Sequence, residues 1–311
     1  MIVVWIALGL AALLLLLGWI CMILALYRSR NMSPLAPGNI EHSAWRKYKD
    51  DVLAGIAWID AQSAEDVSVV SFDGLRLRGR LLPAQNARGT VLLFHGYRSS
   101  ASVDFSCGAR FYHELGFNLL LIDQRAHGAS EGRFIAYGVL ERRDCRTWAE
   151  YCAARFGPAH PLFLAGISMG ATTVLMAAGL PLPASVRGVV ADCGFTSPWD
   201  ILRELMRGRY HIPVFPFLYL MEFFTRLCAR FSLRGASTVD ALARASVPIL
   251  FIHGTDDRFV PCRMTREAYD ACVSEKELLL VEGAGHAVSF LADRAAYTEA
   301  LRSFLAENIE K

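Results

Sequence analysis

A serine between two glycines is the residue of this sequence best suited to chemistry. The pentapeptide Gly166-Ile167-Ser168-Met169-Gly170 follows an apolar run at residues 161–165 and precedes a helix-like run at residues 171–180. A serine on a sharp strand-to-helix turn exposes its hydroxyl, and the turn leaves no room for a Cβ at the flanking positions. The pattern therefore predicts a nucleophile elbow with Ser168 as the nucleophile.

A serine hydroxyl is a weak nucleophile at neutral pH and needs a base, an orienting acid and an oxyanion site. After such an elbow, the chain order is serine, acid, histidine. Three histidines follow Ser168, namely His211, His253 and His286. His286 lies in a glycine-rich loop after the last expected strand, and its glycines would let the loop reach over the sheet edge. His253 ends an earlier strand and His211 lies in an insertion, so His286 is predicted to be the base.

Three aspartates are candidates for the acid. Residues 254–261 follow a predicted strand and contain two adjacent carboxylates, Asp256 and Asp257. Asp257 stands in the arrangement Gly-x-x-Asp-x-x-Val-Pro and is the expected acid, with Asp256 as a helper or loop-capping residue. Asp192, at the end of an earlier strand, is the alternative position for the acid.

The oxyanion hole is expected to use two backbone N–H groups. One belongs to Met169, the residue after the nucleophile, and the other to the loop after the third strand. Residues 95–98 form that loop, which makes Tyr97 the second donor, while Gly96 allows close approach of the backbone. His95 precedes the serine in the chain and is expected to be an architectural hydrogen-bonding residue.

The elements that must position these residues alternate along the chain. An Asp-Gly turn at residues 73–74 predicts a hairpin, and repeated β–α units after it predict a mostly parallel sheet covered on both faces. The expected strands are residues 67–72, 75–82, 90–95, 118–123, 162–167, 186–192, 248–253 and 277–281. The expected helices include residues 140–156, 171–180, 263–273 and 292–306.

The N-terminal segment from Ile2 to Tyr27 contains no charged residue. As a helix it would be about 39 Å long, enough to cross a hydrocarbon core of about 30 Å. A cleavable signal peptide is the alternative, but the segment lacks a basic start, is too long and has no small-x-small cleavage site after it. We therefore expect a single-pass membrane anchor.

Charge around this segment predicts its orientation. No Lys or Arg precedes it, and basic residues follow it, which places the C-terminal domain in the cytoplasm. Those basic residues are Arg28, Arg30, Arg46, Lys47 and Lys49. The eight cysteines form no C-x-x-C pair or zinc-like spacing and fit reduced thiols. A net charge of +2 is too diffuse to predict a nucleic-acid partner.

Two segments join the anchor to the main domain. Residues 31–39 contain two prolines and a glycine and predict a linker, while residues 41–62 have the apolar spacing of a helix. That helix is expected either to pack on the domain or to lie on the membrane surface. The predicted organisation is an anchor at residues 1–28, a linker and juxtamembrane helix at 29–65, and a catalytic domain at 66–311 with a lid at about 194–246.

Residues 67–309 resemble the α/β-hydrolase superfamily, in its serine-aminopeptidase-like and monoacylglycerol-lipase-like branch. In this sequence, Ala126 replaces a glycine of the family pattern in a loop that is structural in the family. The motifs that carry the resemblance are His95-Gly96, Asp123-Gln-Arg-Ala-His-Gly-Ala-Ser130, Gly166-Ile-Ser-Met-Gly170, Gly254-Thr-Asp-Asp-Arg-Phe-Val-Pro261 and Gly285-His286.

The resemblance implies a serine hydrolase that forms an acyl-enzyme and needs neither a metal nor another cofactor. Carboxylic esters or thioesters are the expected substrates. A membrane-anchored peptidase or aminopeptidase is the second hypothesis, ranked lower because no acidic cluster is recognisable as an α-amine site. A non-catalytic scaffold that keeps the hydrolase fold is the third. Within the lid, the aromatic run at residues 211–224 is expected either to pack the lid on the sheet or to face the bilayer and admit lipidic acyl groups.

Overall fold

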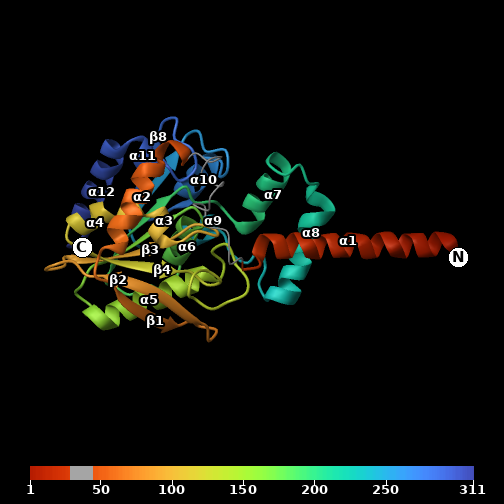
Figure 1. Cartoon of the computed structure of the whole chain (residues 1–311), viewed down its shortest axis with the longest axis horizontal. Coiled ribbons are helices and arrows are strands. Elements are labelled where there is room, and N and C mark those ends of the chain that lie inside the picture. Colours follow the sequence, from red (N-terminus) through yellow and green to blue (C-terminus); the bar gives the residue numbers. More distant parts are fainter. Residues whose placement is uncertain (29–44) are drawn as a thin grey trace.

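An eight-stranded sheet forms the centre of the protein (Figure 1) in the computed structural model, which describes residues 1–28 and 45–311. Its strand order is β1-β2-β4-β3-β5-β6-β7-β8. The pairs β1–β2 and β2–β4 are antiparallel, and the other neighbours are parallel. The strands are β1 (Glu65–Val70), β2 (Arg76–Leu82), β3 (Gly89–Phe94), β4 (Phe117–Asp123), β5 (Leu162–Ile167), β6 (Val186–Asp192), β7 (Ile249–Gly254) and β8 (Lys276–Val281).

This is an α/β-hydrolase fold, and the fold predicted from the sequence is confirmed. Each predicted strand overlaps an observed one, because short apolar runs separated by turns leave little ambiguity in a buried parallel sheet. The hairpin turn lies where the Asp-Gly pair predicts it: Gly74 has a φ of +87° and donates its N–H to the carbonyl of Ser71.

Helices cover both faces of the sheet with two apolar cores. One core contains side chains of α5, α6, α9 and α10, and the other contains side chains of α2, α3, α4 and α12. A third cluster lies beyond the carboxyl ends of the central strands and joins α1 to α7 and α8. These helices are α1 (Ile2–Leu26), α2 (Lys49–Asp60), α3 (Ala101–Asp104), α4 (Ala109–Glu114), α5 (Glu141–Phe156), α6 (Met169–Ala178), α7 (Pro198–Gly208), α8 (Val214–Phe224), α9 (Thr238–Leu242), α10 (Arg263–Ala271) and α12 (Arg294–Asn308), with the short α11 (Ser289–Ala292) before the last.

The helix α1 projects from the body of the protein (Figure 1). The C-terminal part of α1 crosses α8. Its mean hydropathy reaches 2.7 over an 18-residue window, of which only 11% is buried. A helix of this length and composition next to the N-terminus is suited to be a membrane span or a signal sequence.

The predicted juxtamembrane helix is observed as a short 3₁₀ turn, η2 (Arg46–Tyr48), followed by α2. Val52 and Ile59 of α2 are fully buried. A Cβ on Gly55 would lie 2.1 Å from the carbonyl oxygen of Ser106, so the helix is in close contact with the body. The structure thus shows α2 packed on the domain. The linker predicted at residues 31–39 and the start of the predicted helix lie outside the described residues.

Candidate active site

The nucleophile elbow connects β5 to α6. Ser168 has φ of +56° and ψ of −114°, an unfavourable conformation for a residue with a side chain. A Cβ on Gly166 would lie 2.2 Å from the carbonyl oxygen of Gly170, and a Cβ on Gly170 would lie 1.8 Å from that of Phe94. Both distances are severe clashes with backbone, so glycine is required at each flank and the turn presents Ser168 at the end of the sheet.

The structure brings together the three residues predicted for the triad. His286 Nε2 lies 2.9 Å from Ser168 Oγ, and His286 Nδ1 lies 2.7 Å from Asp257 Oδ2. The serine follows β5, the aspartate follows β7 and the histidine follows β8. Because parallel strands end at the same edge, loops separated by 118 residues in sequence meet there.

Asp257 is buried in a network that holds it as a carboxylate. Its Oδ1 accepts the N–H groups of Phe259 and Val260, both at 2.8 Å, and its Oδ2 lies 3.2 Å from His253 Nε2 as well as beside His286. Burial by itself would raise the pKa of Asp257, but the charge of His286 and the hydrogen bonds from the two histidines hold that pKa below its ordinary value. Asp257 therefore stays ionised and accepts a proton donated by His286 Nδ1.

His253 supports the acid and does not reach Ser168. Its Nε2 lies within hydrogen-bonding distance of the Val260 carbonyl, at 3.0 Å, and its Nδ1 lies 2.7 Å from Thr265 Oγ1. Two acceptors, Val260 O and Asp257 Oδ2, face the same ring nitrogen, which indicates that Nε2 carries the proton. Sequence reasoning set His253 aside as a base and missed this contact with the acid.

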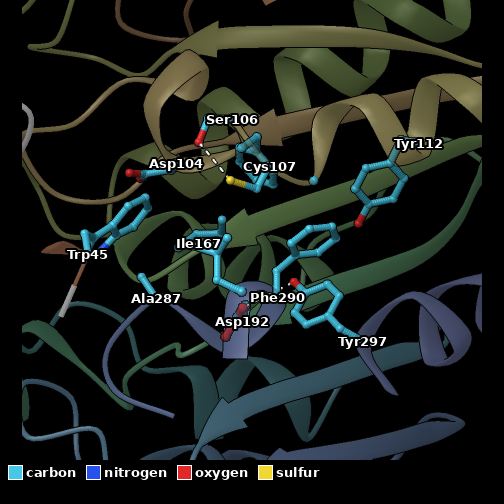
Figure 2. Close-up of a pocket in the computed structure, with 13 residues that line it drawn as sticks. Trp45, Asp104, Ser106, Cys107, Tyr112, Ile167, Asp192, Ala287, Phe290 and Tyr297 are labelled. Atoms are coloured by element: carbon cyan, nitrogen blue, oxygen red, sulfur yellow. Dashed lines mark hydrogen bonds between the residues drawn. The ribbon is translucent and has the colours of Figure 1, made fainter. Parts of the chain in front are cut away.

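The alternative acids lie elsewhere. Asp256 is exposed, while Asp192 is buried beside a small cavity of about 30 Å³ (Figure 2) and accepts hydrogen bonds from Ser289 and Tyr297 at 3.1 and 3.2 Å. Burial raises the pKa of Asp192 to about 6. Neither carboxylate is hydrogen-bonded to His286, so the geometry favours Asp257 among the three candidates.

The loop at residues 95–99, called the oxyanion loop below, lies against the nucleophile. A Cβ on Gly96 would be 3.3 Å from Ser168 Cβ. His95 is buried, with Nδ1 at 2.7 Å from the Gly96 carbonyl and Nε2 accepting the N–H of Gln124, an architectural position. Within the described residues, the backbone N–H groups of Tyr97 and Met169 donate to no protein acceptor. Both are therefore available for an oxyanion.

A half-buried carboxylate that sequence reasoning did not find holds this loop. Asp104 Oδ2 accepts the N–H of Gly96 at 2.5 Å and its Oδ1 accepts the hydroxyl of Ser99 at 2.6 Å. Asp104 also lines the small cavity near Asp192 (Figure 2). Burial raises its pKa despite these hydrogen bonds. Its sequence context, a serine-rich loop, resembles an ordinary turn and gives no signal of this role.

A larger apolar cavity of about 470 Å³ opens at Ser168 and is called the acyl pocket below. Its size is typical of a small-molecule site. Its walls come from the oxyanion loop, Tyr137, Phe259, the lid (residues 194–246) and the last turns of α1. The contribution of α1 could not be read from the sequence, because nothing in an apolar helix indicates which protein surface it contacts. The lining residues are Cys21, Leu24, Ala25, Tyr97, Arg98, Tyr137, Ser168, Phe195, Ile201, Leu202, Leu205, Met206, Tyr210, Ile212, Met221 and Phe259.

One group of potential metal ligands coincides with the triad. Ligand atoms of Cys193, Asp257 and His286 lie within 4.8 Å of one another. However, both carboxylate oxygens of Asp257 and both ring nitrogens of His286 have protein partners. Burial also raises the pKa of the Cys193 thiol well above its ordinary value, which disfavours the thiolate that binds metals. The arrangement fits a proton relay better than a metal site.

Fold and site together define a hydrolase-type nucleophile elbow on an α/β sheet. A model of the alpha/beta hydrolase family matches residues 91–300, most of the chain, and the protein belongs to this family. The predicted membership of the superfamily is thereby confirmed.

Two relatives illustrate the range of this similarity. The uncharacterized protein YqkD of Bacillus subtilis is 27% identical over 235 residues, covering 75% of this chain and 76% of YqkD. The lysophosphatidylserine lipase ABHD12 of Danio rerio is 26% identical over 210 residues, covering 67% of this chain and 52% of the lipase, about half its length.

Among solved structures, the Pyrococcus furiosus esterase Pf2001 aligns with a TM-score of 0.66 over 90% of this chain and 96% of the esterase, at 20% identity. At that identity the likeness shows the fold. Family membership, with a lipase among the relatives, supports hydrolase activity.

Proposed function

We propose that the protein is a serine hydrolase that cleaves carboxylic esters or thioesters through an acyl-enzyme. The observation that carries the proposal is the unbroken hydrogen-bonded chain from Ser168 through His286 to Asp257 at the base of an apolar pocket. The metal-free serine chemistry expected from the sequence needs this geometry and no other group.

The hydrogen bonds support one proton path for this reaction. Asp257 accepts from Nδ1 of His286, which leaves Nε2 of the neutral ring free to take the proton of Ser168. Ser168 Oγ attacks the acyl carbon, and the imidazolium that forms is stabilised by the buried carboxylate. His286 then returns the proton to the leaving alcohol or thiol, and the acyl group stays on Ser168 as an ester.

Water completes the cycle. His286 takes a proton from the water, hydroxide attacks the acyl-enzyme, and Ser168 leaves with the proton returned by His286, which releases the carboxylic acid. In both halves the negative oxygen of the tetrahedral intermediate would accept the N–H groups of Tyr97 and Met169. One such donor contributes about 3 kcal/mol to lowering the barrier.

The lining of the acyl pocket favours esters and thioesters over aminopeptidase substrates. Its described residues include no Asp or Glu that could bind an α-ammonium group, and Arg98 is the one charged side chain among them. An apolar wall next to the nucleophile suits an acyl chain. The name of the related lipase points to lipidic acyl groups, and the monoacylglycerol-lipase-like side of the predicted branch agrees with this preference.

We also propose that α1 is a retained single-pass anchor with the catalytic domain in the cytoplasm. The length and apolarity of α1 support the span, and the basic residues after it support the orientation. In this proposal residues 1–28 are the anchor, residues 29–65 connect it to the domain, and residues 66–311 are the hydrolase domain with its lid.

The test is to label membranes that contain the full chain with a fluorophosphonate, and to compare wild type with Ser168→Ala on esters, thioesters and aminoacyl amides. We expect labelling of Ser168, and a loss of kcat by a factor on the order of 10⁴ or more in the variant with the fold retained. Ordinary turnover by Ser168→Ala would refute the assignment. Turnover of amides alone would favour the peptidase, and absence of labelling would favour the scaffold.

A further inference from the structure

The last turns of α1 are bound to the catalytic domain by specific hydrogen bonds. A helix leaves its final carbonyls without partners inside the helix. Here the Leu24 carbonyl accepts from Arg98 Nη2 at 2.6 Å, and the Ala25 carbonyl accepts the hydroxyl of Tyr97 at 2.8 Å and that of Tyr137 at 3.2 Å. Tyr97 and Arg98 belong to the oxyanion loop, so the end of α1 and that loop form one unit.

The chain after the helix continues this attachment. The N–H of Ile135 donates to the Leu26 carbonyl at 2.7 Å, and Arg28 donates its N–H to the Arg133 carbonyl at 2.8 Å. The Arg28 guanidinium reaches the carbonyl of Ser130 at 2.7 Å. Met22 and Leu26 are fully buried in the same apolar cluster as the lid. A flexible tether would need none of these contacts.

A close crossing fixes α1 against the lid. Gly18 is buried, and a Cβ at this position would lie 2.4 Å from Leu220 Cβ of α8. Gly9, on the part of α1 that projects from the body, has no protein atom within 4 Å of such a Cβ. About one to two turns beyond the crossing, Cys21, Leu24 and Ala25 line the acyl pocket beside Ser168.

Helix length places this crossing at the membrane surface. Residues 2–16 of α1 are exposed and span about 22 Å, less than a hydrocarbon core of about 30 Å. A core of that thickness takes in about 20 residues of helix, so a span that begins at Ile2 reaches the other boundary near Cys21. The mouth of the acyl pocket then lies at the boundary between hydrocarbon and headgroups, where the ester groups of lipids are found.

The exposed face of the lid has the composition of a membrane-facing surface. Tyr219 and Phe223 lie four residues apart on one face of α8 and are 50% and 54% exposed. Phe215, at a non-helical kink near the start of α8, and Leu227, in the π-helical turn η3 (Thr225–Ala229) that follows, are 75% and 64% exposed. Leu218 and Met221, on the other side of α8, are buried in the cluster that surrounds the pocket. An exposed apolar surface of this kind is typical of a membrane or partner contact. Because α8 packs against α1, the proposed membrane span, we assign this surface to the membrane.

From these contacts we propose that α1 is a wall of the acyl pocket, and that the acyl chain of a bilayer lipid enters the pocket between α1 and α8. This inference rests on the proposed hydrolase function and names the substrate class of the same site. The anchor α1 holds the site at the depth of the lipid ester groups, and it forms part of the surface that binds the acyl chain. A cleaved helix would leave the pocket open on one side.

The experiment compares Gly18→Leu with Gly9→Leu in the full chain, reconstituted in phosphatidylcholine vesicles. The measured quantity is the ratio of kcat/KM for a p-nitrophenyl palmitate substrate to that for p-nitrophenyl acetate. We expect Gly18→Leu to lower this ratio about tenfold or more, because the pocket wall is displaced, and Gly9→Leu to keep the wild-type ratio. Cys21→Trp, which fills the pocket without changing the crossing, should lower the ratio in the same way.

Two controls distinguish an effect of α1 on the pocket from misfolding of a variant and from failure of the proposed hydrolase function. Fluorophosphonate labelling of each variant reports whether its Ser168 is assembled. Equal ratios for Gly18→Leu, Cys21→Trp and Gly9→Leu in labelled proteins would overturn the role of α1 while leaving the serine hydrolase intact. Failure of the wild type to be labelled and to hydrolyse either ester would instead reject the proposed function.

Discussion

The candidate active site has two halves that are built differently. The sheet-built half carries Ser168, Asp257 and His286 on loops after parallel strands and holds them with directional hydrogen bonds of 2.7 to 2.9 Å. The helix-built half, from α1, α7 and α8, surrounds the pocket mainly with apolar side chains. Hydrogen bonds lose strength steeply with misalignment, whereas apolar contacts are non-directional. The first half should therefore decide whether the reaction occurs, and the second which acyl group reacts.

The largest effect that separates the halves should come from Asp257→Asn. The amide preserves the shape of the side chain but removes the charge and favours the wrong tautomer of His286, so we expect kcat to fall by about 10⁴-fold. Steady-state kinetics on a short ester would measure the fall. Asp256→Asn, on the exposed neighbour, is the matched control and should stay close to wild type. Comparable losses in the two variants would contradict the assignment of the acid.

The same Asp257→Asn substitution should change the acid stability of the fold. The folded-state pKa of Asp257 is depressed below the unfolded value of about 4. Its stabilising contribution is therefore complete above about pH 4 and is lost as the pH falls further toward the folded pKa. We expect Tm to fall more steeply below about pH 4 in wild type than in the variant, measured by thermal melts at constant ionic strength. Parallel curves would show that the network around Asp257 does not favour its charged form.

A smaller effect is expected behind the oxyanion loop. Asp104→Ala removes the acceptor of the Gly96 N–H and the Ser99 hydroxyl, so the loop should lose its position relative to Ser168. We expect kcat to fall by about 10²-fold with KM little changed, because an oxyanion donor acts mainly in the transition state. Asp104→Asn can still accept the Gly96 N–H and should recover most of the activity. A rise in KM alone would indicate a role in substrate binding.

The smallest effect on catalysis is expected in the helix-built half. Leu205→Trp places a larger side chain in the acyl pocket from α7, so long acyl chains should lose about tenfold in kcat/KM and short ones less. A series of p-nitrophenyl esters of increasing chain length would measure this. Val273→Trp, at an exposed position outside the pocket, is the control. A uniform loss across all chain lengths would mean that this half also sets the reaction geometry.

The sheet and the order of its elements followed from the sequence with little error. Apolar runs of strand length, separated by helical periods, admit few arrangements, and the observed strands begin and end within about two residues of the predicted ones. The elbow could be predicted from the sequence just as well, because only glycine fits on either side of Ser168. A Cβ on Gly166 or on Gly170 would lie 2.2 or 1.8 Å from a backbone oxygen. Such signals are local, and a single sequence contains them.

The acid of the predicted triad was harder to identify from the sequence. Asp192 ends a strand and Asp256 and Asp257 follow one, and sequence spacing ranked the three without excluding any. Burial and side-chain direction distinguish them: Asp257 alone of the three hydrogen-bonds His286. His253 and Asp104 went unrecognised because their partners depend on how distant loops fold back on the sheet.

The sequence by itself thus determined the fold and an apolar helix long enough to span a membrane, and it predicted the candidate nucleophile and its candidate base, since each depends on local pattern or on chain order. The tertiary structure alone decided which carboxylate faces the base, which carboxylate holds the oxyanion loop, and that Cys21, Leu24 and Ala25 of the apolar helix line the pocket. Those contacts join residues far apart in the chain, and their geometry exists only once the sheet has brought the loops to one edge.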